Sequence, residues 1–201
     1  MRIATRRLAV VGMLGAISII LGLTPLGFIP IGPTKATIMH IPVIIGAIIE
    51  GPVVGMLIGL IFGAFSMFQA YVMPTSPVQV VFLDPLVAVV PRLFIGVTSY
   101  YAYWGLKKLM TTKTLNGRRM LLPSMAAAAV GTITNTVGVL GMIYIRHAAE
   151  YANLLGIEQS TVGKFIIYGV AIPNGVPEII VAVLVVTAVV QALSKLYKKA
   201  F

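Results

Sequence analysis

The sequence has no cysteine, only two histidines and few charged residues. The lack of cysteine excludes disulfides, cysteine-ligated zinc and thiol nucleophiles. The two histidines, His40 and His147, stand far apart in the chain, so a histidine-based metal site is not expected and no cofactor is predicted. Charged residues make up 10% of the chain, whereas a soluble domain would carry roughly a quarter. The composition therefore points away from a soluble protein.

Sequence motifs of common hydrolases are absent as well. The chain contains no G-x-x-x-x-G-K-[ST] phosphate-binding loop, so it is not expected to hydrolyse nucleotides itself. It also lacks H-E-x-x-H and G-x-S-x-G, which argues against metal- or serine-dependent hydrolysis in the membrane. No convincing internal repeat of the kind expected for an ion-coupled transporter is present. We therefore predict no catalytic residues and a protein that depends on partners for energy.

Apolar residues are abundant: they make up 59% of the 201 residues, and the mean hydropathy is +1.01. A transmembrane helix needs about 20 such residues, and six runs reach or approach that length. We predict an all-α integral membrane protein, a single domain (residues 1–201) built as a bundle of six transmembrane helices. The helices are expected at residues 8–26, 37–49, 53–71, 84–106, 120–144 and 165–193. The second run is short enough that a re-entrant segment is an alternative.

The distribution of the 15 lysines and arginines predicts the orientation of this bundle. Eleven lie before the first helix, between the fourth and fifth, or after the sixth; three lie on the opposite side, and Arg92 lies within a helix. The eleven are Arg2, Arg6, Arg7, Lys107, Lys108, Lys113, Arg118, Arg119, Lys195, Lys198 and Lys199. Because Lys and Arg collect in cytoplasmic loops, both termini are predicted to be cytoplasmic. The formal charge of +10 then reflects topology and attraction to anionic lipid, and no nucleic-acid partner is needed.

Small residues recur at four-residue spacing in several helices, which lets helix backbones approach closely in lipid. The third helix carries Gly55, Gly59 and Gly63, for which close packing within the bundle is the expected role. The first helix carries Gly12 and Ala16 at the same spacing. Because this helix is outermost in the sequence, an interface with a partner protein is the alternative to internal packing there.

Polar side chains at membrane depth mark the candidate site, because they are costly in lipid and usually face a cavity or the bundle interior. Arg92 stands about two turns into the fourth helix, after Asp84, for which helix capping is the expected role. The remaining candidates are His40, Gln69, Asn135, Asn174 and Glu178. They gather toward the outer half of the bundle, whereas the cytoplasmic half is nearly all apolar. The sequence therefore predicts a pocket open to the outside, with a kinked or broken helix at residues 173–177.

Structural roles compete with ligand binding at these positions. Arg92 is expected either to bind an anionic group or to pair with Glu178 or Asp84. Asn135 and Asn174 suit hydrogen bonds between helices as well as they suit ligand contacts. A different class of protein is also open: a membrane enzyme in which Asp84, Glu178 and Arg92 act on a lipid or prenyl substrate. A channel-like bundle is a third alternative.

Several sequence blocks, in this order and spacing, resemble the S components of energy-coupling factor (ECF) vitamin transporters. They are residues 12–16 (GMLGA), 40–47 (HIPVIIGA), 51–63, 84–92 (DPLVAVVPR) and 174–178 (NGVPE). The resemblance implies a subunit of the bacterial cytoplasmic membrane that captures a vitamin from outside and works with a membrane T-component scaffold and two cytoplasmic ATPases. It further implies that Gly12 and Ala16 contact the scaffold, as the pair that matches an A-x-x-x-A motif with glycine in place of the first alanine. Residues 72–83 would form a lid over the pocket.

Within this family, residues 29–33 and 37–42 look most like the pantothenate and folate branch. Pantothenate is favoured because its carboxylate would suit Arg92, whose planar guanidinium can form two parallel hydrogen bonds. Its hydroxyls and amide would suit Asn135 and Asn174. Folate is second, since its pterin ring calls for more aromatic stacking than the outer face offers, and riboflavin, hydroxymethylpyrimidine and cobalamin stay open.

Overall fold

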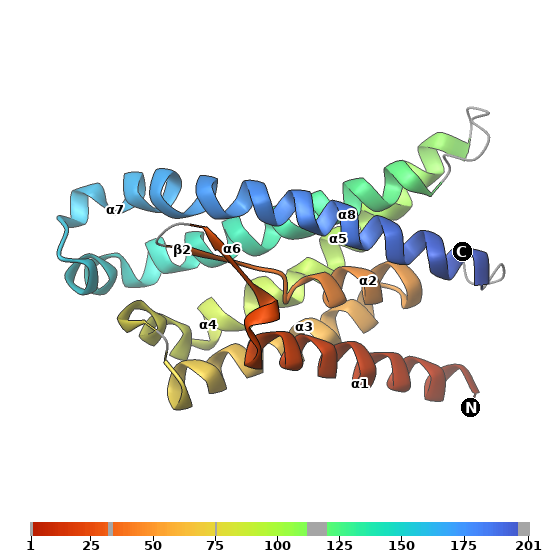
Figure 1. Cartoon of the computed structure of the whole chain (residues 1–201), viewed down its shortest axis with the longest axis horizontal. Coiled ribbons are helices and arrows are strands. Elements are labelled where there is room, and N and C mark those ends of the chain that lie inside the picture. Colours follow the sequence, from red (N-terminus) through yellow and green to blue (C-terminus); the bar gives the residue numbers. More distant parts are fainter. Residues whose placement is uncertain (1, 32–33, 75, 112–119, 197–201) are drawn as a thin grey trace.

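The structure of the chain is a computed structural model that describes residues 2–31, 34–74, 76–111 and 120–196. Its helices run along one long axis and form an elongated bundle (Figure 1). Several of the basic residues assigned above to the cytoplasmic side lie outside the described residues, as does Thr75 of the expected lid. These basic residues are Lys113, Arg118, Arg119, Lys198 and Lys199.

Within the described residues, 5 helical stretches are long and apolar enough to cross a membrane. They are α1 (Arg2–Leu23), α3 (Pro52–Val72), α4 (Pro85–Ala88) with α5 (Val90–Thr111), α6 (Leu121–Leu155), and the stretch of η3 (Gln159–Thr161), α7 (Val162–Lys164), the π-helix η4 (Phe165–Ala171) and α8 (Ile172–Leu196). The chain is thus a helical multi-pass membrane protein, as predicted.

The second predicted helix is α2 (Ile41–Glu50), and it lies in the interior of the bundle. At 1.5 Å per residue it is about 15 Å long, too short to cross a hydrocarbon core of about 30 Å by itself. All of its residues from Ile41 to Ile48 are buried, and it packs against α1, α3, α5 and α8. A helix that is apolar all round is stable where other helices surround it. The short second run therefore encodes a core helix.

Two helices differ from their predicted form away from the end where the start of α1 lies. The fourth predicted helix is interrupted at Val89, between α4 and α5. The fifth was expected to end at residue 144, but α6 continues to Leu155. Its backbone kinks at His147 (φ −128°, ψ 19°), which redirects the last turns. The apolar pattern ends near residue 144, so sequence periodicity alone underestimates the helix.

The helix predicted to be kinked or broken at residues 173–177 is not broken there. The helix α8 begins at Ile172 and runs through Pro177, and the irregular backbone is the π-helix η4 just before it. The wider π-helical turns are a recognised irregularity within α-helices. The distortion is therefore taken up before the prolines.

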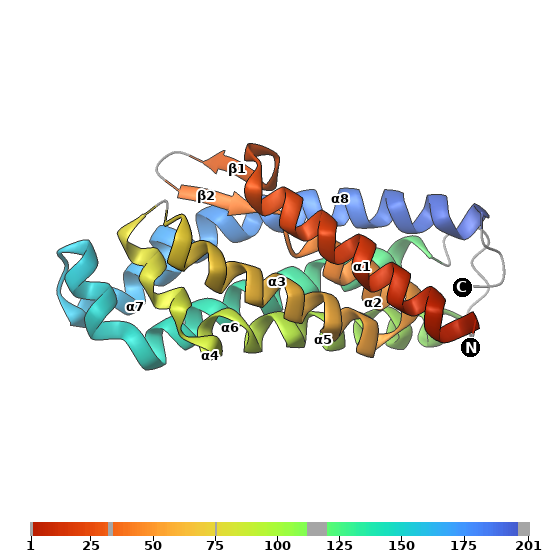
Figure 2. The same cartoon turned by 90° about the horizontal axis from the view of Figure 1, so that it is seen from below.

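A short β-hairpin that the sequence analysis did not predict follows α1. After the 3-10 turn η1 (Pro25–Gly27), strand β1 (Phe28–Ile31) pairs antiparallel with β2 (Thr34–Thr37). The hairpin lies beside α8, with β2 in contact with that helix (Figure 2). A Cβ at Gly27 would collide with the backbone carbonyl of Leu21, so the turn into the hairpin requires glycine. The hairpin brings Thr37 to the candidate site.

The glycine stripe of α3 packs within the bundle, as predicted, and its neighbours are α4 and α5. A Cβ at Gly59 would collide with the backbone carbonyl of Arg92, and Gly55 meets Gly96 backbone to backbone. One turn further, Gly63 lies against Ala88 and Val89. Without an apolar driving force between helices in lipid, such close approach supplies the packing contacts. This stripe therefore fixes the position of the Arg92 backbone.

The start of α1 and the end of α8 lie at the same end of the bundle (Figures 1 and 2). Glu50, at the end of α2, reaches this end too: Arg6 contacts its carboxylate at 2.7 Å and Arg7 at 3.8 Å. Lys107 of α5 lines a cavity there together with Arg7 and Glu50. Arg6, Arg7 and Lys107, three of the cations assigned to the cytoplasmic side, thus lie at one end of the bundle.

Candidate substrate-binding site

Arg92 is a buried cation in the first turn of α5, with 5% of its surface exposed. Its Nη1 donates a hydrogen bond to the backbone carbonyl of Val87 at 2.7 Å. The guanidinium carbon lies 5.3 Å from the ring centre of Phe62 on α3 and 5.2 Å from that of Phe82. Phe82 belongs to η2 (Pro77–Leu83), the 3-10 segment of the expected lid. The Nε of Arg92 is buried without a hydrogen-bond partner among the described residues.

Among the described residues, no carboxylate oxygen lies within 4.0 Å of an Arg92 nitrogen. Asp84 instead accepts from Arg146 at 2.5 Å and lies 3.0 Å from His147 Nε2, both on α6. It also accepts from the backbone N–H of Leu86 at 2.9 Å, which confirms its predicted role as a helix cap. The Arg146 guanidinium lowers the pKa of the Asp84 carboxyl to about 2. Asp84 therefore ties α4 to α6.

Glu178 is a buried carboxylate on α8, with 4% of its surface exposed. Its Oε1 accepts from the backbone N–H of Thr37 on β2 at 2.6 Å. Its Oε2 accepts from the hydroxyl of Thr136 on α6 at 3.3 Å. Glu178 thus joins the hairpin, α6 and α8, and its charge acts on Arg92 through space without direct contact.

His40 and Asn135 complete the polar interior on the α2 and α6 sides. The fully buried His40 places Nε2 at 2.9 Å from the hydroxyl of Thr132, and the charge of Arg92 also acts on it. Asn135 lies between Thr132 and Thr136 in the sequence of α6. The Oδ1 of Asn135 is buried and has no hydrogen-bond partner among the described atoms. Asn174 is buried on α8, four residues before Glu178. These side chains come from α2, α5, α6 and α8.

Comparisons with known proteins bear on what this interior binds. A family model described as "ECF transporter, substrate-specific component" matches residues 6–190, nearly the whole chain. The chain belongs to this family.

Two curated relatives carry more specific names. A protein of Lactococcus lactis subsp. cremoris named "Pantothenic acid transporter PanT" is 32% identical over 176 residues, which cover 81% of this chain and 80% of the relative. A protein of Leuconostoc mesenteroides subsp. mesenteroides named "Pantothenate transporter PanT" is 29% identical over 180 residues, 90% of this chain and 85% of the relative. The expected resemblance to S components is confirmed, and the similar proteins are transporters.

Three predicted positions of this S component, one on α3 and two on α1, lie apart from the polar interior. Gln69 of α3 donates from Nε2 to the backbone carbonyl of Gly22 at 3.1 Å, so it links α3 to the end of α1. Gly12 and Ala16 are exposed on α1, and a Cβ added at Gly12 would meet no atom within 4 Å. The surface at Gly12 and Ala16 is thus open to a neighbour in the membrane.

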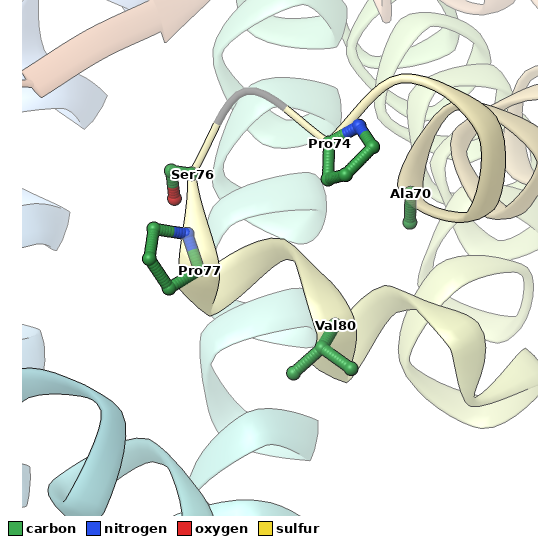
Figure 3. A pocket seen from close by; sticks show the side chains of 5 residues that line it. All are labelled: Ala70, Pro74, Ser76, Pro77 and Val80. Carbon is green, nitrogen blue, oxygen red and sulfur yellow. The ribbon is translucent and has the colours of Figure 1, made fainter.

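A pocket open to the surface lies where α3 ends and η2, part of the expected lid, begins (Figure 3). Its volume is about 470 Å³, and it is lined by Ala70, Pro74, Ser76, Pro77 and Val80. Figure 3 shows the side chains of Pro77 and Val80 on the side of η2 that borders this cavity. Two residues further along, Phe82 contacts the guanidinium of Arg92. One short segment therefore lines the cavity and contacts the buried cation.

Sequence reasoning missed the aromatic and hydroxyl partners of the charged groups. Thr132 stands three residues before Asn135 and four before Thr136, so the helical period could have placed Thr132 beside both of them. Phe62 and Phe82 carry no such signal, because phenylalanine in an apolar run is indistinguishable from ordinary packing. Thr37 contributes its backbone N–H, which no side-chain pattern reveals.

Proposed function

We propose that this S component captures pantothenate from outside the bacterial cell and delivers it inward. The observation that carries the proposal is the buried guanidinium of Arg92, which has a free Nε and no carboxylate in contact among the described residues. A buried charge normally has a partner, because an isolated ion is costly to desolvate. The carboxylate of pantothenate would supply that partner. The names of the two relatives support the same substrate.

The roles of the other groups follow from their chemistry. Asn135 and Asn174 carry both donors and acceptors, which suits the hydroxyls and the amide of pantothenate. His40, held by Thr132, would add a ring nitrogen to the same interior. In this proposal Asp84 and Gln69 support the site from outside, since both are engaged with other parts of the chain. Glu178 holds the hairpin beside the bound molecule.

Energy for release inside would come from partner proteins. In this proposal a membrane T-component and two cytoplasmic ATPases form the rest of the importer, and the bundle sits in the bacterial plasma membrane with both termini cytoplasmic. The exposed pair Gly12 and Ala16 supports α1 as the contact with the T-component, because small residues permit close helix approach. The basic end near Glu50 would then face the cytoplasm.

Equilibrium binding to the purified full chain in detergent tests the proposal. Labelled pantothenate is expected to bind with a dissociation constant below about 1 µM, and folate, riboflavin, hydroxymethylpyrimidine and cobalamin are expected not to compete. Tighter binding of one of the competitors would replace pantothenate while leaving the transport role intact. Absence of tight binding across the whole vitamin panel would refute the capture role.

A further inference from the structure

The polar interior holds one positive and one negative side chain that do not touch. Arg92 and Glu178 are both nearly completely buried, and no Arg92 nitrogen lies within 4.0 Å of a Glu178 oxygen. They act on each other through space. An unbalanced charge is costly where water is excluded, so the interior is most stable when its net charge is near zero. With both groups ionised, these two charges cancel.

An anionic substrate at Arg92 upsets this balance. The substrate carboxylate would neutralise the guanidinium, and the carboxylate of Glu178 would then stand in the interior without a countercharge. Among the described side chains, the charged or titratable groups near Glu178 are Arg92 on α5 and, beyond it, His40 at the start of α2. The contacts from β2 and α6 are the neutral N–H of Thr37 and hydroxyl of Thr136. No second described cation is in place to compensate.

The two oxygens of Glu178 are held in different ways. Oε1 accepts from a backbone N–H, a donor that cannot become an acceptor. Oε2 faces the hydroxyl of Thr136, which can accept a hydrogen bond as well as donate one. A proton on Oε2 could therefore be donated to Thr136 while the bond between Thr37 and Oε1 stays intact. The site accommodates the carboxyl group in both its charged and neutral forms.

We propose that Glu178 takes up one proton from solution when the anionic substrate binds at Arg92, so that substrate and proton enter the interior together as a neutral pair. The proton adds to Oε2 of the carboxylate, and no other covalent bond forms or breaks. The substrate stays ionised against the guanidinium. This inference rests on the proposed function, because it takes Arg92 as the partner of the pantothenate carboxylate.

Calorimetric titration of the full chain in detergent measures the proton directly. Pantothenate is titrated in buffers of different ionisation enthalpy above about pH 6, where its own carboxyl stays ionised. The wild type is expected to take up close to one proton per bound molecule, and its affinity to fall by up to about tenfold for each pH unit of increase. Pantothenol, which has an alcohol in place of the carboxylate, is expected to bind with no proton uptake.

Two variants identify the group that takes the proton. Glu178→Gln is expected to abolish proton uptake and to make pantothenate affinity independent of pH, because the amide is permanently neutral. His40→Gln is expected to keep the uptake whatever its affinity. Uptake that persists in Glu178→Gln, or that disappears only in His40→Gln, would overturn the assignment.

The wild-type titration separates this inference from the proposed function. Tight pantothenate binding without proton uptake refutes the role of Glu178 and leaves the capture role standing. Failure of the wild type to bind pantothenate refutes the capture role itself. Should Glu178→Gln not fold, the comparison of pantothenate with pantothenol on the wild type still decides whether substrate charge and proton uptake are linked.

Discussion

The ring centre of Phe82 lies 5.2 Å from the guanidinium carbon of Arg92. One residue belongs to η2, the segment beside the small outer cavity, and the other to the membrane-embedded part of α5. Phe62 covers the guanidinium at a similar distance, 5.3 Å. A cation over an aromatic face is attracted by the ring, the more strongly when both are desolvated. The segment η2 and the buried cation are thereby coupled, which leads to the first prediction.

Phe82→Leu is expected to loosen η2 and to raise the dissociation rate of pantothenate more than it lowers the association rate. Leucine keeps an apolar contact but loses the cation–π attraction, worth about 0.5–2 kcal/mol. Affinity should fall by a few-fold up to about thirtyfold, measured by stopped-flow or surface-based kinetics. Tyr71→Leu, at a highly exposed aromatic on α3, is the control and should change neither rate. Equal effects of both substitutions would contradict the coupling.

Arg92→Ala is expected to weaken pantothenate binding by about 1.5–3 kcal/mol, the range for a hydrogen bond to a charged group. Arg92→Lys keeps the charge but loses the planar fork, so it should recover only part of the affinity. Isothermal titration measures both variants, and pantothenol serves as the matched ligand because it lacks the carboxylate. Unchanged pantothenate affinity together with a lower melting temperature would assign Arg92 a purely structural role.

Gly59→Ala is expected to destabilise the bundle by about 1–3 kcal/mol, because the added Cβ meets the Arg92 backbone carbonyl and forces α3 and α5 apart. The same displacement should weaken substrate binding. Gly141→Ala on α6 is the control, since a Cβ there meets no atom within 4 Å. Thermal unfolding in detergent reports both effects. Equal melting temperatures for the two variants would show that the close approach of α3 and α5 is dispensable.

Asp84→Ala is expected to lower the free energy of unfolding by about 1 kcal/mol through the lost helix cap. The loss of the contacts with Arg146 and His147 should lower it further. Asp84→Asn keeps a capping oxygen and should be less destabilising. The folded protein lowers the Asp84 pKa from 3.8 to about 2, so the ionised carboxylate stabilises the fold above about pH 4. That contribution is lost as the pH falls through about 2. Melting temperatures measured downward from neutral pH should converge for wild type and Asp84→Asn, and a constant difference would contradict the ion pair.

Gly12→Leu is expected to reduce pantothenate uptake by cells while the purified variant still binds pantothenate. The side chain would project from an open face of α1, so the fold should tolerate it, but a helix of the T-component could no longer approach closely. Co-purification of the importer subunits measures the interface. Ile20→Leu, exposed on the same helix, is the matched control. Normal complex formation by Gly12→Leu would place the interface elsewhere.

Local sequence features predicted a large part of this molecule. Apolar runs of sufficient length identified the membrane helices, since no other backbone form satisfies its hydrogen bonds in lipid so simply. The α3 glycines were recognised from their spacing, and they do pack closely against α4 and α5. Asp84 followed by Pro85 indicated a helix start, and Asp84 caps α4. Each of these features depends on residues close together in the chain.

The sequence predicted which residues make up the candidate site but not how they interact. Arg92, Asn135, Asn174 and Glu178 were noticed because polar groups are rare at membrane depth, and all four are buried. Their partners were not predictable. Glu178 accepts from a strand 141 residues earlier in the chain, and Asp84 pairs with Arg146 and His147 but not with Arg92. Pairing across such separations depends on how the helices pack.

The sequence by itself determined that this chain is a membrane protein and that Arg92 is the one lysine or arginine within a predicted membrane helix. Both conclusions depend only on how favourably each residue is solvated by lipid or by water, which is a property of the residue itself. The tertiary structure decided what surrounds that charge. Packing of α3 on α5 placed Phe62 over the guanidinium, and the path of η2 brought Phe82 to its side. The hairpin carried the N–H of Thr37 to Glu178, leaving Arg92 without a carboxylate in contact among the described residues. These relations arise from close approach in three dimensions, which no local pattern encodes.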